Sequence, residues 1–280
     1  MSAYVLGVVL FAALLHALWN AAVKASVKGS LPSTAIFIGA GIVAAFLLPF
    51  LPLPAGASWP FLLGSVAVHC AYSILLGRAY QAGDFSHAYP LMRGLPPLLT
   101  ATLMAIFSDE RTTTLQQVGI FTLCCGILSL ALEAGLGSPK LKRAAGWAVL
   151  VAVTIGVYTT LDGFGGRLSG HAGAYVAWTC FLEAVCLGTW LVARQGPAAM
   201  LLVLRRWPIT LVGGATTLAA YALVVWAMTQ APVALVAALR ESSVVFAALL
   251  GVVVFKERLG PVRVIAIALV LAGIFLMRSS

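Results

Sequence analysis

Two arginines stand inside long apolar stretches of this chain, Arg93 in the first half and Arg240 in the second. A charged side chain at membrane depth costs several kcal/mol, so it usually faces a cavity and serves a function. A guanidinium binds a carboxylate through two parallel hydrogen bonds, which suits an amino acid or an organic acid. We therefore predict that both arginines contact a substrate carboxylate. The alternative is structural: Arg240 pairs with Asp162, and Arg93 snorkels towards lipid headgroups.

Three acidic residues in the same apolar surroundings are candidates for gating or proton coupling. Glu241 adjoins Arg240, and Asp162 is expected at a similar depth, where the sixth membrane span ends. Either carboxylate can neutralise Arg240 and hold a gate closed, and one released from such a pair can carry a proton. Glu183, expected in the middle of the seventh span, completes the set.

A second group of candidate substrate contacts consists of aromatic and polar residues within the predicted spans. Aromatic rings can stack on a planar or apolar substrate, and several of these side chains also carry a polar group that prefers a partner. Helix packing is the alternative for each of them, and for the histidines it is a hydrogen bond to a neighbouring helix. The group comprises His16, Trp19, His69, Tyr72, Tyr89, Tyr158, Trp178, Tyr221, Trp226 and Ser243.

The segment around Arg93 is rich in residues that interrupt helices. Proline removes a backbone donor and frees an earlier carbonyl, so this segment is expected to kink or unwind. We interpret it as a hinge made by Pro90, Gly94, Pro96 and Pro97. The corresponding segment of the second half, 240–243, offers serine hydroxyls that can bond to backbone or ligand.

The elements that position these residues must be membrane-spanning helices. Hydrophobic residues make up 62% of the 280 residues and charged residues only 9%, which leaves too little polar surface to coat a soluble globule. The apolar residues form long blocks, whereas a transmembrane β-barrel uses short alternating runs. We therefore predict an all-α integral membrane protein and exclude an outer-membrane barrel.

Charge and cysteine usage indicate no further ligand. The Lys and Arg residues behind the net charge of +9 are dispersed through short connectors, unlike a nucleic-acid footprint. The five cysteines lie in apolar stretches without metal-binding spacing, which favours packing. We expect no metal, no cofactor and no nucleic acid. The expected partners are a small-molecule substrate and the lipid bilayer; the oligomeric state is open, a monomer included.

Cutting the chain at Pro, Gly and charge clusters gives ten candidate spans near the length that a transmembrane helix needs. They cover residues 4–23, 32–51, 60–81, 87–107, 115–134, 144–161, 172–193, 208–230, 232–255 and 261–277. The first lacks the basic start of a cleavable signal peptide, so we interpret it as a retained helix. The connectors are short, which confines any chemistry to the bilayer or its edge.

The two halves of the chain match each other at a constant offset of 147 residues. The matched pairs are Arg93 with Arg240, Glu110 with Glu257, Arg111 with Arg258, and Gly126 with Gly273. Each half, 1–137 and 138–280, therefore carries five predicted helices. Because five is odd, the second half enters the membrane from the opposite side, and the repeats are inverted. Inverted repeats are typical of alternating-access carriers.

The distribution of basic residues predicts the orientation. Most Lys and Arg near helix ends lie in the odd-numbered connectors, which the positive-inside rule places in the cytoplasm. Both termini are then expected on the outer, periplasmic side.

In two short motifs the chain resembles the drug/metabolite transporter (DMT) superfamily, specifically its EamA-type exporters. The motifs are Ser108-Asp-Glu110-Arg111 with Gly126, and Phe255-Lys-Glu257-Arg258-Leu-Gly260 with Gly273. The first span, with His16-Ala-Leu-Trp19-Asn20, also resembles that family's opening segment. The resemblance covers essentially the whole chain, and among the family it is similar to bacterial exporters of amino acids, aromatic ones in particular.

The resemblance implies a carrier of the bacterial inner membrane. Its central cavity would be lined by helices one, three, four, six, eight and nine, with helices five and ten outside it. Small multidrug members depend on a first-helix glutamate, where this chain has His16, with Tyr158 near the matching place in helix six. This departure weakens a cationic-drug function. We expect alternating-access export of small metabolites, above all amino acids including aromatic ones; the alternative is a nucleotide-sugar, drug or other metabolite carrier of the same fold.

Two other classes of membrane protein are disfavoured. An enzyme needs a nucleophile, a base and an orienting group within reach of each other, and the sequence has no Gly-x-Ser-x-Gly or His-Glu-x-x-His motif. A channel needs a selectivity element such as rings of carbonyls or like charges, which neither half supplies. We therefore predict a protein that is not an enzyme.

Overall fold

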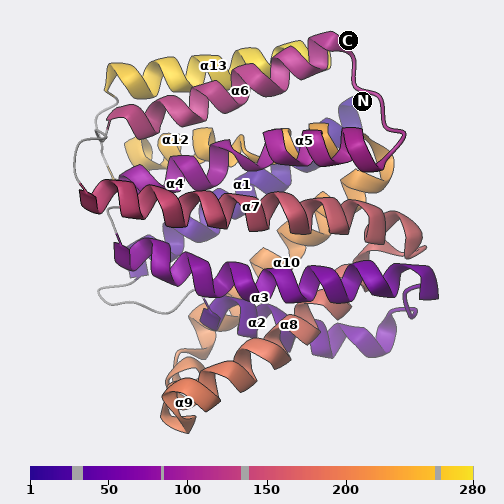
Figure 1. The fold of residues 1–280 in the computed structure, drawn as a ribbon. Helices are drawn as coiled ribbons and strands as arrows, with labels where there is room; N and C mark the ends of the chain where they lie inside the picture. Colours follow the sequence, from indigo (N-terminus) through magenta and orange to yellow (C-terminus); the bar gives the residue numbers. More distant parts are fainter. Residues whose placement is uncertain (27–33, 83–84, 134–138, 256–259, 280) are drawn as a thin grey trace.

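The computed structural model of the chain describes residues 1–26, 34–82, 85–133, 139–255 and 260–279 (Figure 1). These residues form thirteen α-helices and two short 3₁₀ turns, and no strand occurs among them. Eight segments are long and apolar enough to cross a membrane. Large apolar side chains stand exposed around the bundle, Phe50 by 85% and Val253 by 76%, as lipid contact requires. The chain is a multi-pass membrane protein.

The helices of the first half follow the predicted spans with one interruption. They are α1 (Ala3–Ser26), α2 (Thr34–Leu47), α3 (Trp59–Ala82), α4 (Phe85–Gly94), α5 (Pro96–Phe107) and α6 (Thr114–Glu133). The 3₁₀ turns η1 (Leu48–Phe50) and η2 (Gly56–Ser58) connect α2 to α3.

The second half contains one helix more than the first. Its helices are α7 (Pro139–Leu168), α8 (Ala172–Gln195), α9 (Pro197–Arg205), α10 (Trp207–Gln230), α11 (Val233–Arg240), α12 (Ser243–Phe255) and α13 (Pro261–Arg278).

Proline and glycine set several helix ends. Proline occupies the first turn of α5, α9, α10 and α13, where its missing N–H costs nothing. Gly170 and Gly196 adopt positive φ angles of 71° and 79° and turn the chain into α8 and α9, a conformation that glycine adopts without strain. His171 caps α8, because its Nδ1 accepts a hydrogen bond from the Ala174 N–H at 3.0 Å.

Two predicted boundaries were wrong. The second span ends as an α-helix at Leu47, four residues early, because Pro49 and the prolines that follow cannot continue it. The sixth span continues to Leu168, so Asp162 lies inside α7 and not at its end. The seventh connector contains the short helix α9. Two shorter apolar helices, Ala3–Leu18 and Thr34–Phe50, join the eight long segments, and ten crossings remain the sequence-based prediction.

Two of the predicted spans are broken in the middle. The fourth consists of α4 and α5, which meet at Leu95, directly before Pro96. The ninth consists of α11 and α12, separated by Glu241 and Ser242, although no proline is present there. The first break was predicted; the second was not.

The helix contacts come in matched pairs (Figure 1). The third span contacts the sixth (α3 with α7), and the first contacts the eighth (α1 with α10); likewise α3 packs on α8 and α10 packs on α2. Helices α6 and α13, the fifth and tenth spans, pack along each other at one edge of the bundle. A two-fold relation between the halves would produce these pairs, and the inverted orientation of the repeats stays a prediction.

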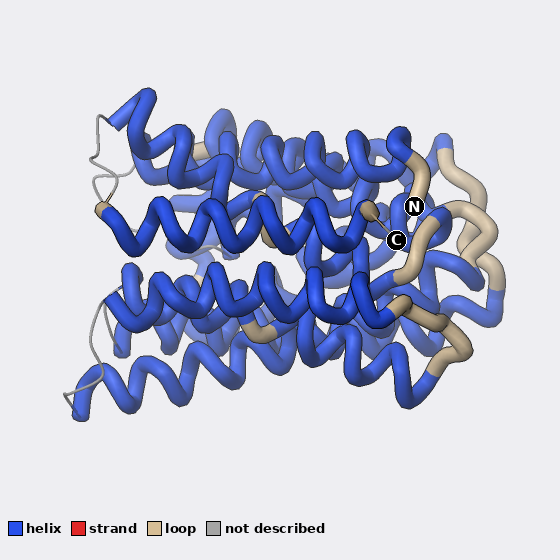
Figure 2. Tube along the Cα trace, turned by 90° about the horizontal axis from the view of Figure 1, so that it is seen from above, coloured by secondary structure: helices blue, strands red, loops and turns tan. Residues whose placement is uncertain are grey.

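Both chain ends and several of the described connectors lie together at one end of the bundle (Figure 2), whereas α9, between α8 and α10, lies towards the other end (Figure 1). The apolar core is densest around the short helix α11, in which every residue from Val233 to Leu239 is buried. Helices α1, α5, α6 and α10 surround it. The core therefore places Arg240, the last residue of α11, inside the protein.

The packing of α6 against α13 makes a test of the fold. A Cβ added at Gly273 would lie 2.6 Å from the Gly119 carbonyl oxygen and 2.8 Å from the Leu123 backbone nitrogen. Backbone atoms cannot move aside as a flexible side chain can. Gly273→Ala is therefore expected to lower the free energy of unfolding by about 1–3 kcal/mol. A lowered thermal unfolding midpoint of the purified protein in detergent would show it.

The control is Gly146→Ala in α7, where nothing lies within 4 Å of the added Cβ. This substitution is expected to leave the midpoint unchanged or raise it, since alanine favours helix over glycine. Equal midpoints for the Gly273 and Gly146 variants would contradict the packing of α6 on α13.

Candidate functional site

Arg93 and Arg240 share one buried carboxylate, that of Glu241. Arg93 Nε lies 2.7 Å from Glu241 Oε2, and Arg93 Nη2 donates a hydrogen bond to Ser243 Oγ at 3.0 Å. Arg240 Nε and Nη2 both lie 3.4 Å from Glu241 Oε1. The Glu241 side chain has no exposed surface. We call these four residues, Arg93, Arg240, Glu241 and Ser243, the arginine cluster.

The broken helices bring this cluster together. Arg93 lies in the last turn of α4 and Arg240 in the last turn of α11, where the free carbonyls of a helix C-terminus favour positive charge. Glu241 and Ser243 occupy the break and the start of α12. Arg93 and Ser243, which are 150 positions apart in the sequence, thus meet where two helices are interrupted.

Arg240 does not pair with Asp162. Instead, Asp162 accepts hydrogen bonds from Ser65 Oγ at 2.5 Å, Tyr175 Oη at 3.2 Å and Tyr221 Oη at 2.6 Å. These three hydroxyls, supplied by α3, α8 and α10, satisfy the carboxylate, and α7 can therefore continue past it. Sequence reasoning missed Ser65 and Tyr175; the spacing of Ser65 and His69, one helical turn apart on α3, was the available signal.

His69 connects the Asp162 group to an aromatic group. Its Nδ1 lies 3.0 Å from the Ser65 carbonyl oxygen and 3.1 Å from Ser65 Oγ. Its ring stacks on Tyr158, with ring centroids 3.9 Å apart, and Tyr72 contacts Tyr158 edge-on at 5.8 Å. Tyr158 in turn lies within electrostatic range of Arg93, Arg240 and Asp162. This aromatic group lies between the arginine cluster and Asp162.

The remaining predicted site residues fall into two sets. His16 of α1 lies within electrostatic range of Arg93 and Arg240, and Tyr89 precedes Arg93 by one turn of α4. Trp178 instead packs against Trp59 and Phe181, and Trp226 packs edge-on against Tyr4 at 5.7 Å. Both tryptophans serve helix packing here. The side chain of Trp19 lies outside the described residues.

Glu183 is buried in α8 with 3% of its surface exposed. Its Oε1 has no hydrogen-bond partner. His69 and Asp162 are titratable groups within its electrostatic range.

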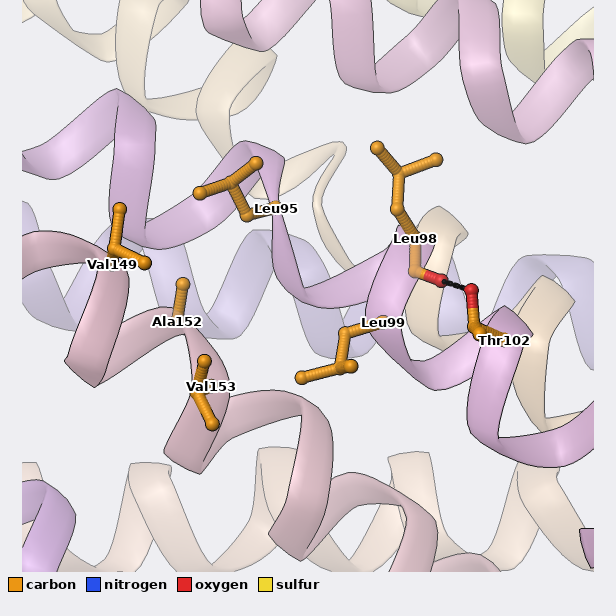
Figure 3. A pocket seen from close by; sticks show the side chains of 7 residues that line it. All are labelled: Leu95, Leu98, Leu99, Thr102, Val149, Ala152 and Val153. Carbon is orange, nitrogen blue, oxygen red and sulfur yellow. Dashed lines mark hydrogen bonds between the residues drawn. The ribbon is translucent and has the colours of Figure 1, made fainter. Parts of the chain in front are cut away.

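An apolar groove lies next to the predicted hinge, and none of the four hinge residues lines it (Figure 3). Leu95, Leu98, Leu99 and Thr102 from one side face Val149, Ala152 and Val153 of α7 from the other. The only hydroxyl in this lining, that of Thr102, donates to the Leu98 carbonyl oxygen at 2.9 Å. The groove therefore offers nothing that could hold a charged substrate. Pro90, Gly94, Pro96 and Pro97 are all buried beside it or within the break.

An ion pair that sequence reasoning missed ties the two halves together at the end of the bundle that holds both chain termini. Arg167, near the end of α7, pairs with Glu110 from the connector after α5. Arg167 also donates hydrogen bonds to the carbonyls of Met228, at 2.8 Å, and Ala231, at 2.9 Å. Glu110 Oε2 accepts from the Val233 N–H at 3.0 Å. The pair thus caps the C-terminus of α10 and the N-terminus of α11 together, and we call it the latch.

The latch gives a second prediction. Arg167→Gln leaves two carbonyls and Glu110 without their donor, and a group left unsatisfied in this way costs about 1–3 kcal/mol. We expect a lower thermal unfolding midpoint, and Arg167→Lys should restore only part of it, since one ammonium cannot reproduce the guanidinium fork.

The matched control is Arg143→Gln, which changes an exposed arginine near the start of the same helix. It should leave the midpoint unchanged. A midpoint for Arg167→Gln equal to that of Arg143→Gln would show that the latch does not hold the two halves together.

Comparison with known proteins agrees with the fold and with part of the resemblance. Residues 142–279 match the EamA-like transporter family, so the second half carries an EamA-like domain. The nicotine metabolites export pump subunit NepA of Paenarthrobacter nicotinovorans is 29% identical over 107 residues, which cover 37% of this chain and 88% of NepA. A solved crystal structure with 21% identity superposes with a TM-score of 0.79 over 99% of both chains and shows that the fold is shared along the whole length.

Proposed function

We propose that the whole chain is an EamA-type carrier of the DMT superfamily that exports small carboxylate-bearing metabolites, amino acids including aromatic ones first among them. The second half matches the family, and the matched helix contacts described above support a first half of the same architecture. A relative named as an export pump subunit supports the direction of transport. We place the carrier in a bacterial inner membrane with both termini on the periplasmic side, and we assign it no enzymatic reaction.

The arginine cluster carries this proposal. A guanidinium keeps its proton inside a protein, so Arg93 and Arg240 bring two positive charges to a site where Glu241 supplies one negative charge. The cluster therefore retains an unbalanced positive charge in a low-dielectric environment, where electrostatic attraction is strong. A substrate with one carboxylate balances it.

Glu241 then acts as a stand-in for the substrate. It holds both arginines while the site is empty, Arg93 at 2.7 Å and Arg240 at 3.4 Å. The longer contact is the weaker one, so Arg240 is the arginine more easily captured by an entering carboxylate. Tyr72, Tyr89 and Tyr158 provide flat faces nearby, which suit an aromatic side chain.

The latch fits the same mechanism. Under the proposed orientation it lies on the periplasmic side, where Glu110 of the first half holds Arg167 and the α10–α11 corner of the second half. Alternating access requires this contact to break when the site opens outward. The counterpart of Glu110 at the other end, Glu257, lies outside the described residues.

Removing either arginine is expected to weaken carboxylate binding. Charge-assisted hydrogen bonds contribute about 1.5–3 kcal/mol, so Arg93→Gln and Arg240→Gln should each raise the half-saturating concentration of labelled phenylalanine about 10- to 100-fold. The measurement is exchange in proteoliposomes, normalised to folded protein, with Arg143→Gln as the control. Unchanged phenylalanine exchange in both variants would contradict carboxylate anchoring.

Removing the stand-in should have the opposite effect. Glu241→Gln frees both arginines from their internal partner, so the same assay should show tighter phenylalanine binding than in the wild type. If Glu241→Gln weakens phenylalanine exchange as much as Arg93→Gln, the arginine cluster holds the helix breaks together and does not bind substrate.

A further inference from the structure

Three carboxylates are buried among the described residues, and they differ in how they are compensated. Glu241 is held by two arginines. Asp162 accepts hydrogen bonds from three hydroxyl groups. Glu183 has neither kind of support, since its Oε1 is enclosed without a hydrogen-bond partner. A carboxylate taken out of water in this way is strongly disfavoured, whereas the uncharged acid is tolerated.

The position of Glu183 is unusual for an ionisable residue. It lies near the middle of α8, in a segment apolar enough to cross the membrane, where an ionisable group costs several kcal/mol and usually has a function. A structural role would need a partner, and the enclosed oxygen has none. An exchangeable proton explains an acid that is buried without a partner.

The groups that face Glu183 define its electrostatic environment. Helix α3 supplies His69 and Cys70, α7 supplies Asp162, and α8 itself supplies Cys180 and Cys186 one turn away on either side. Tyr221 of α10 lies within range of Cys180. Helix α2, which packs along α8, contains no ionisable residue, and α9 contains only Arg205 at its end. No described Lys or Arg among these groups neutralises Glu183.

Glu183 is nevertheless connected to the arginine cluster. It interacts electrostatically with His69 and Asp162, and His69 contacts Ser65, which donates to Asp162. His69 also stacks on Tyr158, which lies within range of both arginines. A change of charge at Glu183 therefore acts electrostatically on His69 and Asp162, which are joined by contacts to Ser65 and, through His69, to Tyr158 near the proposed substrate site.

We propose that Glu183 is the proton-binding group that couples export to a proton gradient. The inference rests on the proposed function and adds the coupling ion and its site. One proton entering from the outer side binds the carboxylate and gives the neutral acid, which is the form that the closed helix packing around α8 favours. When the site opens to the cytoplasm, the acid releases that proton there, and the exported substrate moves in the opposite direction.

The test separates exchange from proton-driven transport. Purified protein in proteoliposomes is assayed for labelled phenylalanine exchange at equal pH, and for phenylalanine accumulation driven by an imposed pH gradient. Glutamine mimics the protonated acid permanently, so Glu183→Gln should keep exchange and lose the gradient-driven accumulation. Glu183→Asp, which keeps a titratable group, should retain some of both activities. Asp109→Asn, an exposed acid outside the helices, is the matched control and should retain both.

Several outcomes would overturn the proposal. Gradient-driven accumulation that persists in Glu183→Gln would place the proton elsewhere, and its selective loss in Asp162→Asn would assign it to Asp162. If Glu183→Gln loses exchange as well, the Glu183→Asp variant decides. A folded Glu183→Asp protein that still exchanges phenylalanine but no longer responds to the pH gradient would overturn the role of Glu183. A Glu183→Asp protein that still responds to the gradient would support it.

The proposed function fails in a different way. Wild-type protein that moves no amino acid in either assay would contradict the substrate class. Wild-type protein that exchanges phenylalanine but ignores the pH gradient would leave the carrier function intact and overturn the proton site.

Discussion

A guanidinium inside a membrane protein must be compensated, because it cannot lose its charge and the bilayer cannot solvate it. Arg93 and Arg240 impose this constraint on the centre of the molecule. Glu241 is wholly buried and compensates their charge by contacting both arginines. One positive charge is left uncompensated. The same cluster therefore holds the helix breaks together when it is empty and binds an anion when a substrate enters.

The helix breaks follow from this constraint. Irregular backbone is tolerated at membrane depth only where protein or a polar cavity covers it, and both breaks in this chain occur next to an arginine of the cluster. Each arginine lies in the last turn of a short helix, whose free carbonyls favour its charge. The latch uses the same physics at the end of the bundle, where Arg167 and Glu110 cap the two helix ends of the α10–α11 corner. The charged side chains of the arginine cluster and the latch thus lie at helix ends.

The sequence predicted what depends on composition and local chemistry. The helical membrane fold and the break before Pro96 were accessible in this way, and the pairing of Arg240 with Glu241 was one of two pairings that the sequence offered. The course of α7 past Asp162 was not accessible, because it depends on hydroxyls from three other helices. The latch was not predicted either, since three of its four contacts involve backbone groups, which every residue type carries. The break at Glu241 was not predicted because no proline is present there.

The most direct test of the central claim is to ask whether the carboxylate of the substrate is what the protein binds. Phenylalanine, 3-phenylpropionate and phenethylamine share the aromatic ring and differ in their charged groups. The account predicts that both carboxylates compete with labelled phenylalanine for uptake into proteoliposomes and that the amine does not, because only a carboxylate can balance the positive charge that Glu241 leaves uncompensated on Arg93 and Arg240. Competition by the amine alone, or equal competition by all three, would contradict it.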